Sequence, residues 1–167
     1  MKSHRLLLFI ALVSATVFAA QAQAREMVRF SGYPPGTIVV RTSERQRYFV
    51  TGNGSAIRYP VGVGRAGMAW SGRARVARKL IRPSWGPPLD IWQRNPHLPA
   101  IIPGGSPQNP MGAAVLGLNR GNYAIHGTSD PSSIGRFVSH GCIRMFNADI
   151  IDLYNRVPVG TPVVVLP

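Results

Sequence analysis

Cysteine is scarce in this sequence, because Cys142 is the only one in 167 residues. A single cysteine excludes an internal disulfide and leaves no CxxC pair for the four-ligand sites that structural zinc prefers. Acidic residues are scarce as well, with six Asp and Glu against nineteen Lys and Arg and a formal net charge of +13. This excess favours an anionic partner, or is simply a basic, soluble surface. No nucleic-acid recognition motif is present, so the expected partner is not a nucleic acid.

Long apolar runs are limited to one, between residues 6 and 20. Lys2 and Arg5 precede this run, and Ala22-Gln23-Ala24 follows it as a small-x-small sequence. The pattern is typical of a secretory signal peptide, since a membrane span needs about 20 apolar residues. We expect residues 1–24 to be removed, with Ala22 as the alternative cleavage position, and the protein to be exported to a periplasm or cell wall. The net charge of the mature chain is then +11, which is 13 minus the charges of Lys2 and Arg5.

The rest of the chain divides into a short lead-in, residues 25–35, and a single domain, residues 36–167. It shows no internal repeat, no linker between domains and no second candidate membrane span, and its length suits one hydrophobic core. Short apolar stretches bounded by Gly, Pro and Asn predict a mainly β fold. The expected strands are residues 37–42, 47–50, 56–64, 73–82, 113–118, 123–127 and 163–166.

One helix is expected near the C-terminus. Asn147 is a good N-cap residue, and Asp149 lies in the first turn, where the helix dipole favours a negative charge. Ile150, Ile151 and Tyr154 form an apolar face, and the helix is expected to continue through Arg156.

A long Pro-rich segment, residues 83–110, predicts an irregular loop of the kind that binds or covers a ligand. Trp85 and Trp92 in this loop either contact a substrate or fill the core, and both interpretations are open. In the strand before it, Leu80 is expected on the buried face with the other apolar residues, because apolar and basic residues alternate.

The residues that can carry chemistry lie between His126 and Arg144, a stretch that holds the only cysteine and two of the four histidines. A thiol has a pKa of roughly 8.5 and is a weak nucleophile until a base takes its proton. Imidazole is the natural proton acceptor near neutral pH, so Cys142 with His126 or His140 predicts thiol catalysis. Gly141 allows a tight turn whose amides can stabilise an oxyanion. The alternatives are a buried structural cysteine and a zinc site.

The order of these residues narrows the choice of family. Papain-like peptidases place Cys before His, whereas here His126-Gly127 precedes Ser139-His140-Gly141-Cys142-Ile143-Arg144. This arrangement resembles the L,D-transpeptidase catalytic (YkuD-like) family, whose signature is His-Gly, a spacer, and Ser/Thr-His-Gly-Cys-aliphatic-Arg/Asn. The likeness extends over residues 36–165. It implies a β-rich sandwich of mixed or antiparallel sheets with a C-terminal helix.

The resemblance also implies an activity. Cys142 would attack the third residue of a peptidoglycan stem tetrapeptide, usually meso-diaminopimelate, with loss of D-Ala and formation of a thioester. An amine acceptor would then resolve the thioester into a 3→3 cross-link. Carbapenems would acylate the same thiol, and neither a metal nor another cofactor would be required.

Roles for the surrounding residues follow from the same resemblance. His126 is implied as the general base and later the acid, and His140 as a group that shapes and polarises the pocket. Arg144 is implied either as a ligand for a substrate carboxylate or as an internal strut of the loop. Residues implied to support the loop or the oxyanion are Ser139, Gly141 and Gly127, with the Cys142 amide.

Several functions can use this site. Water as the acceptor would make the domain an L,D-carboxypeptidase, and a protein lysine would attach proteins to peptidoglycan. A wall-binding module without catalysis is the alternative of a different class. The sequence also departs from the family pattern, because Ala69-Trp70-Ser71-Gly72 stands where many members carry Thr-Pro-x-Gly. This departure leaves the local donor and acceptor contacts open.

Overall fold

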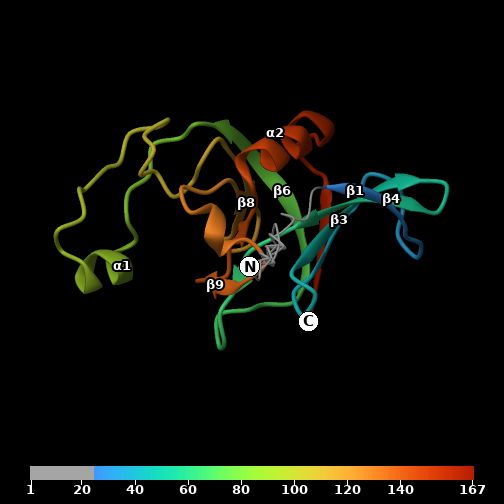
Figure 1. Cartoon of the computed structure of the whole chain (residues 1–167), viewed down its shortest axis with the longest axis horizontal. Coiled ribbons are helices and arrows are strands. Elements are labelled where there is room, and N and C mark those ends of the chain that lie inside the picture. Colours follow the sequence, from blue (N-terminus) through green and yellow to red (C-terminus); the bar gives the residue numbers. More distant parts are fainter. Residues whose placement is uncertain (1–24) are drawn as a thin grey trace, which may run out of the picture.

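The computed structural model describes residues 25–167, and the expected signal peptide, residues 1–24, lies outside the described residues. The described chain is mainly β, as predicted, and its longer helix lies near the C-terminus (Figure 1). The strands are β1 (Glu26–Arg29), β2 (Ile38–Arg41), β3 (Gln46–Gly52), β4 (Ser55–Pro60), β5 (Val63–Gly64), β6 (Gly72–Ile81), β7 (Ala114–Leu118), β8 (Ala124–His126), β9 (Phe137–Ser139), β10 (Ile143–Arg144) and β11 (Pro162–Leu166). The helices are α1 (Leu89–Arg94), α2 (Asn147–Arg156) and the 3-10 turn η1 (Pro131–Ser133).

Nine strands form one mixed sheet in the order β1-β4-β3-β2-β11-β6-β7-β8-β10, and β5 pairs with β9. Most neighbours are antiparallel, but β11 runs parallel to β2, and β10 runs parallel to β8. Strand β6 joins the two halves of the sheet, because it pairs first with β11 and then with β7. A register shift between Val76 and Arg78 marks a bulge at this junction, where a strand can bend. The predicted fold class, a mainly β domain with mixed strand pairing, is confirmed.

Both halves of the sheet and helix α2 enclose one hydrophobic core. Helix α2 buries Ile150 and Leu153, whose spacing of three residues places them on one helix face. Core residues with no exposed surface come from both halves of the sheet, and they include Ile38, Val40, Tyr59, Leu116 and Ile125. Because α2 packs on β7 and β8, it holds the strand that ends at His126 firmly in the core.

The lead-in, residues 25–35, is more regular than the sequence suggests. Its first residues form β1, which pairs antiparallel with β4 from Glu26 opposite Arg58 to Arg29 opposite Ser55. An open strand edge offers unpaired N–H and C=O groups, and β4 provides such an edge to the segment that precedes β2. The strand therefore depends on a partner that becomes available only in the folded sheet.

Three local expectations differ from the structure. The expected strand 56–64 is two strands, because β4 ends at Pro60 and β5 pairs with β9 instead. Leu80 is 41% exposed, since the bulge at Ala77 shifts the alternation and turns Leu80 to the other face. Asn147 is the first residue of α2 and not its N-cap, a position that Phe146 occupies without a side-chain hydrogen bond.

The Pro-rich segment between β6 and β7 forms an arm that extends away from the sheet and carries α1 (Figure 1). Backbone hydrogen bonds between Trp85 and Ile102 close the base of the arm, and the buried side-chain amide of Asn109 donates to three backbone carbonyls there. Trp85 is only half-buried and Trp92 is 43% exposed, so the interpretation of these rings as core residues is wrong. An arm that projects from the sheet lacks the second layer that would bury them.

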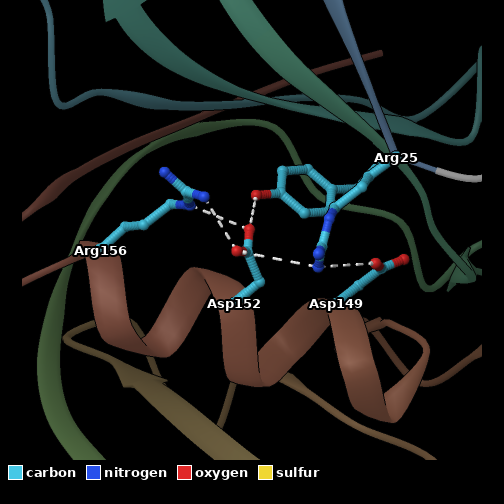
Figure 2. A network of polar contacts seen from close by, with 5 residues as sticks. Arg25, Asp149, Asp152 and Arg156 are labelled. Atoms are coloured by element: carbon cyan, nitrogen blue, oxygen red, sulfur yellow. Dashed lines mark hydrogen bonds and ion pairs between the residues drawn. The ribbon is translucent and has the colours of Figure 1, made fainter.

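A fully buried arginine, Arg47, lies between the sheet and α2, with its guanidinium 4.0 Å from the centre of the Tyr59 ring. Burial lowers the pKa of Arg47 to about 10, and the neighbouring Tyr59 side chain and the carboxylates of Asp149 and Asp152 oppose that shift. The Asp152 carboxylate accepts a 2.5 Å hydrogen bond from the Tyr59 hydroxyl and pairs with Arg156 (Figure 2). A network of charges therefore connects the first strands to α2.

Candidate active site

The parallel pairing of β8 and β10 places three of the predicted site residues on one face of the sheet. Arg144 lies opposite His126, and Ile143 lies opposite Ile125. Paired residues project to the same face and alternate residues share it, so Cys142 joins Arg144 and His126. The two isoleucines occupy the opposite face and are buried in the core. The sheet register thus brings together residues that are sixteen to eighteen positions apart (142 − 126 and 144 − 126).

The His126 imidazole is buried, with 1% of its surface exposed. Burial lowers the pKa of His126 to about 4, although hydrogen bonds to the carbonyl groups of Gly127 and Pro110 oppose the shift. The ring is therefore neutral at pH 7. Its Nδ1 lies 2.6 Å from the Gly127 carbonyl oxygen, which can only accept, so Nδ1 carries the proton. Nε2 is then the ring nitrogen that is able to accept a proton.

The Cys142 thiol is half-buried, and its Sγ lies 3.8 Å from the carbonyl oxygen of Asn122. Burial raises the pKa of Cys142, against the opposing effects of the Ala124 backbone and the Arg144 charge. No hydrogen bond joins Sγ to the His126 ring among the described residues. The predicted pair shares one face, but at rest it consists of a neutral thiol and a neutral imidazole.

This protonation state gives a prediction for the reactivity of the thiol. Only a thiolate is alkylated, so the rate for Cys142 should be low at neutral pH and should rise continuously between about pH 7 and about pH 10. The measurement is the rate of iodoacetamide adduct formation by intact-protein mass spectrometry, with glutathione as the matched control thiol. A plateau of fast alkylation already at acidic pH would indicate a preformed thiolate–imidazolium pair and would contradict the expectation.

The loop before Cys142 is held by Ser139. Its Oγ donates to the Cys142 carbonyl at 2.5 Å and accepts from the Gly141 amide at 3.0 Å. Gly141 has φ +116°, and a Cβ there would lie 2.4 Å from the Tyr123 ring, so glycine is required at this position. The Gly141 amide is engaged in this conformation. It would have to release Ser139 before it could donate to an oxyanion.

The segment between β4 and β5, residues 61–62, also holds the loop. The amides of Gly62 and Arg144 donate reciprocally to each other's carbonyl oxygens, at 2.9 and 2.8 Å. A Cβ on Gly62 would lie 2.6 Å from the Ser133 carbonyl oxygen, which explains the glycine in a segment that passes so close to the loop. These contacts anchor the backbone of Arg144 while its side chain remains half-exposed.

His140 lies at the edge of this loop and points its Nε2 into the protein, where that atom is buried without a hydrogen-bond partner. Burial lowers the pKa of His140, and the positive charges of Arg65, Arg94 and Arg144 lower it further. Arg94 belongs to α1, so a charge of the arm contributes to the electrostatic environment of His140. The ring is thus held neutral beside the loop.

Two aromatic residues that sequence reasoning did not select support the loop. The indole Nε1 of Trp70 donates to the Gly141 carbonyl at 2.9 Å, and the Trp70 ring stacks on Tyr123 at 5.2 Å between centroids. Trp70 occupies the place where the family pattern has Thr-Pro, so the departure itself was the available signal. In this chain an indole supplies a contact that holds the cysteine loop.

Asn147 was expected to cap α2 and instead connects the loops around the site. Its Oδ1 accepts the amides of Ala113 and Thr128 at 3.0 and 3.1 Å, and its Nδ2 donates to the Thr128 carbonyl at 3.0 Å. A Cβ on Gly127 would lie 2.2 Å from Oδ1, so the glycine after His126 is needed to admit this amide. Gly127 therefore supports the loop by its small size.

Within residues 25–167, no three His, Cys, Asp or Glu side chains lie close enough together to hold a metal ion. Within the same residues, no helix has the length and apolar content that a membrane span needs.

Comparison with known proteins decides the family. A family model described as the L,D-transpeptidase catalytic domain matches residues 35–165. The chain belongs to this family. YbiS and ErfK/SrfK of Escherichia coli K12, both named probable L,D-transpeptidases, are 40% identical over 135 residues and 38% identical over 138 residues. These alignments cover 75% and 77% of this chain but 43% of each relative, so the chain spans less than half the length of these L,D-transpeptidases.

Solved structures share the fold. L,D-transpeptidase 3 from Mycobacterium tuberculosis has a TM-score of 0.59 at 19% identity, covering 78% of this chain and 60% of that one. A crystal structure from Brucella melitensis is 40% identical, with a TM-score of 0.57 and coverage of 86% of this chain and 93% of that one. The Brucella protein is named a probable carnitine operon oxidoreductase. That name applies to the Brucella protein and does not change the L,D-transpeptidase family assignment of this chain.

Proposed function

We propose that this domain transfers acyl groups of peptidoglycan stem peptides as an L,D-transpeptidase, with Cys142 as the nucleophile and His126 as the general base. The observation that supports the proposal is the β8–β10 register, in which Arg144 pairs with the buried His126 and the alternate residue, Cys142, is expected on the same face. Membership of the L,D-transpeptidase family supports the reaction class. We also propose that residues 1–24 direct export, which would bring the enzyme to its substrate.

In the first half-reaction, Sγ of Cys142 forms a bond to the carbonyl carbon of the third stem-peptide residue while Nε2 of His126 takes the thiol proton. Because both groups are neutral at rest, the proton moves as the sulfur attacks. The amides at Cys142 and Gly141 face the developing oxyanion once Ser139 releases Gly141. Collapse of the intermediate breaks the bond to D-Ala, whose amine takes the proton from His126, and a thioester remains.

In the second half-reaction, an acceptor amine attacks the thioester carbonyl, and His126 takes the proton that the amine loses. The C–S bond breaks, the cysteine sulfur takes the proton back from His126, and an amide joins the two stem peptides. His140 remains neutral beside the loop and polarises the pocket without storing a charge. Arg144 projects from the same face and attracts a carboxylate of the substrate.

The experiment that tests this proposal is mass spectrometry of purified disaccharide-tetrapeptide after incubation with residues 25–167. We expect a cross-linked dimer and released D-Ala, and we expect neither product from protein whose thiol was first blocked by alkylation. Tripeptide without dimer would assign water as the acceptor and make the domain an L,D-carboxypeptidase. Dimer formation only after a lysine-containing protein is supplied as acceptor would assign protein attachment. An accessible thiol with no product from any of these mixtures would overturn the enzymatic proposal in favour of a wall-binding module.

A further inference from the structure

Arg78 lies across the sheet on the face that carries Cys142. A Cβ built on Gly117 would lie 2.7 Å from Cγ and 2.8 Å from Nε of Arg78, so the arginine side chain occupies the space above that glycine. Arg78 belongs to β6 and Gly117 to β7, and the two residues are directly paired. The missing side chain at position 117 is therefore what allows the arginine to extend over β7.

The register continues this row toward the thiol. Gly117 pairs with Ala124 of β8, and Ala124 stands beside Cys142, one position before the Ile125–Ile143 pair. Residues paired across strands project to the same face, so Arg78, Gly117 and Ala124 form one row across β6, β7 and β8, which continues to Cys142, the residue before β10. Adjacent strands lie about 4.8 Å apart, which places the Arg78 Nε above Gly117 at roughly 10 Å from Cys142. The two residues between them, Gly117 and Ala124, are buried and have small side chains or none, so no large side chain of this row separates the guanidinium from Cys142.

Among residues 25–167, the Arg78 guanidinium has no carboxylate partner. It is exposed, and no hydrogen bond or ion pair of residues 25–167 involves it. The acidic residues of the chain are engaged elsewhere: Glu26 with Arg58, Glu44 with Arg41, Asp90 with Arg94, Asp149 and Asp152 with Arg25, and Asp130 as the cap of η1. An exposed arginine with no such partner, in the same row of the sheet as a nucleophile, is suited to bind a carboxylate of a ligand.

We propose that Arg78 binds the carboxylate at the far end of the side chain of the third stem-peptide residue while the carbonyl of that residue lies at Cys142. This inference rests on the proposed function and adds a residue that selects the acyl donor. The side chain of a diaminopimelate places its second carboxylate six bonds, or roughly 7–8 Å, from the attacked carbonyl carbon. That span fits the separation between the thiol and the guanidinium. A planar guanidinium can hold such a carboxylate through two parallel hydrogen bonds.

Binding in the absence of turnover tests this inference. In the Cys142→Ala background, we expect Arg78→Gln to weaken binding of disaccharide-tetrapeptide about tenfold, as loss of one charge-assisted pair should do. A ligand in which the side-chain carboxylate is converted to an amide should bind about tenfold more weakly to the Cys142→Ala protein, and Arg78→Gln should not weaken it further. Arg78→Lys should bind more tightly than Arg78→Gln but more weakly than an intact Arg78, because lysine keeps the positive charge but cannot form two parallel hydrogen bonds to the carboxylate.

Gly117→Ala tests the placement without changing the charge. The added Cβ would lie 2.7 Å from the Arg78 side chain and would displace the guanidinium, so the affinity for disaccharide-tetrapeptide should fall about threefold or more. In an Arg78→Gln background, Gly117→Ala should lower the affinity much less, because the interaction that it disturbs is already lost. Arg73→Gln is the matched control, because Arg73 is an exposed arginine of the same strand and pairs with Val164 of β11, away from β7. It should leave the affinity within about twofold.

Equal weakening of the carboxylate and amide ligands by Arg78→Gln, or an effect no larger than that of Arg73→Gln, would overturn the assignment. These outcomes are separable from failure of the proposed function. If wild type forms products and the Arg78 variants bind donor normally, only the role of Arg78 is wrong. If wild type forms no product and the Cys142→Ala protein does not bind the tetrapeptide, the proposed function itself is wrong, and Arg78 has no stem-peptide ligand.

Discussion

Cys142→Ala is expected to abolish acyl transfer, with a loss of about 10³-fold or more in the rate of tetrapeptide consumption. The reason is that no other thiol exists in the chain, so the thioester has no alternative atom on which to form. The same substitution should abolish the mass adduct that a carbapenem forms with the wild-type protein. Both readouts are intact-protein or product mass spectrometry on matched samples.

The controls for this variant separate chemistry from folding. Sγ of Cys142 makes one long contact, 3.8 Å to the Asn122 carbonyl, so its removal should leave the melting temperature nearly unchanged. His126→Gln keeps the thiol and should still be alkylated to completion by iodoacetamide at high pH, although its turnover falls. A Cys142→Ala protein that melts normally and still forms dimer would show that the nucleophile lies elsewhere.

The residues that could be identified from the sequence are those whose signal is local. His126, Ser139 and Cys142 lie in one recognisable sequence motif, and the register of β8 with β10 then brings His126 and Cys142 to one face. The apolar face predicted for α2, Ile150, Ile151 and Tyr154, does pack on the core, because helical periodicity is carried by neighbouring residues. Ile150 is fully buried and the other two are half-buried, whereas Leu153, which the prediction did not include, is fully buried. For these residues the chain near each position already contains the information that decides their structure.

The features that could not be predicted depend on distant partners. Asn147 is a residue type that favours the N-cap, but its side chain instead accepts hydrogen bonds from the amides of Ala113 and Thr128, more than eighteen positions away. Simple alternation of apolar and basic residues does not reveal Arg78, because the bulge between Val76 and Arg78 changes which face the later residues occupy. A bulge and a glycine on the neighbouring strand together decide where this side chain lies.

A second large effect concerns stability. Asp152→Ala is expected to lower the free energy of unfolding by about 3 kcal/mol, because it removes a charge that offsets the buried Arg47 guanidinium and leaves the Tyr59 hydroxyl without its acceptor. For a domain of this length, such a loss corresponds to a fall of about 6–10 °C in melting temperature. Differential scanning calorimetry or urea unfolding of residues 25–167 measures the change.

Asp90→Ala is the matched control. Asp90 also pairs with an arginine four residues later, Arg94 at 2.8 Å, but both side chains are more than half exposed. An exposed pair of this kind contributes about 0.5 kcal/mol or less. The Asp152–Arg156 pair has nearly the same distance, 2.9 Å, yet its carboxylate is 16% exposed and also faces Arg25 (Figure 2). Equal effects of the two substitutions would contradict a stabilising role for the buried network.

The pH dependence of this difference follows from the pKa of Asp152. Hydrogen bonds from Arg156 and then from Tyr59 lower that pKa to about 2, while burial opposes them. A carboxyl whose pKa is lower in the folded protein stabilises the fold above its unfolded pKa of about 4 and loses this contribution as pH falls toward 2. The gap in stability between wild type and Asp152→Ala should therefore be widest at neutral pH and should narrow in acid.

The Arg47→Met variant tests which group is responsible for the loss of stability in Asp152→Ala. Arg47 is fully buried, and its guanidinium nitrogens make no hydrogen bond to the described residues that meets ordinary geometric limits. If Asp152→Ala destabilises the fold because it leaves the buried Arg47 charge without a counter-charge, it should lower the free energy of unfolding much less in an Arg47→Met background. An unchanged cost in that background would show that the loss comes from Tyr59, Arg25 and Arg156 alone. A reduced cost would show that the carboxylates of α2 are present to balance a cation in the core.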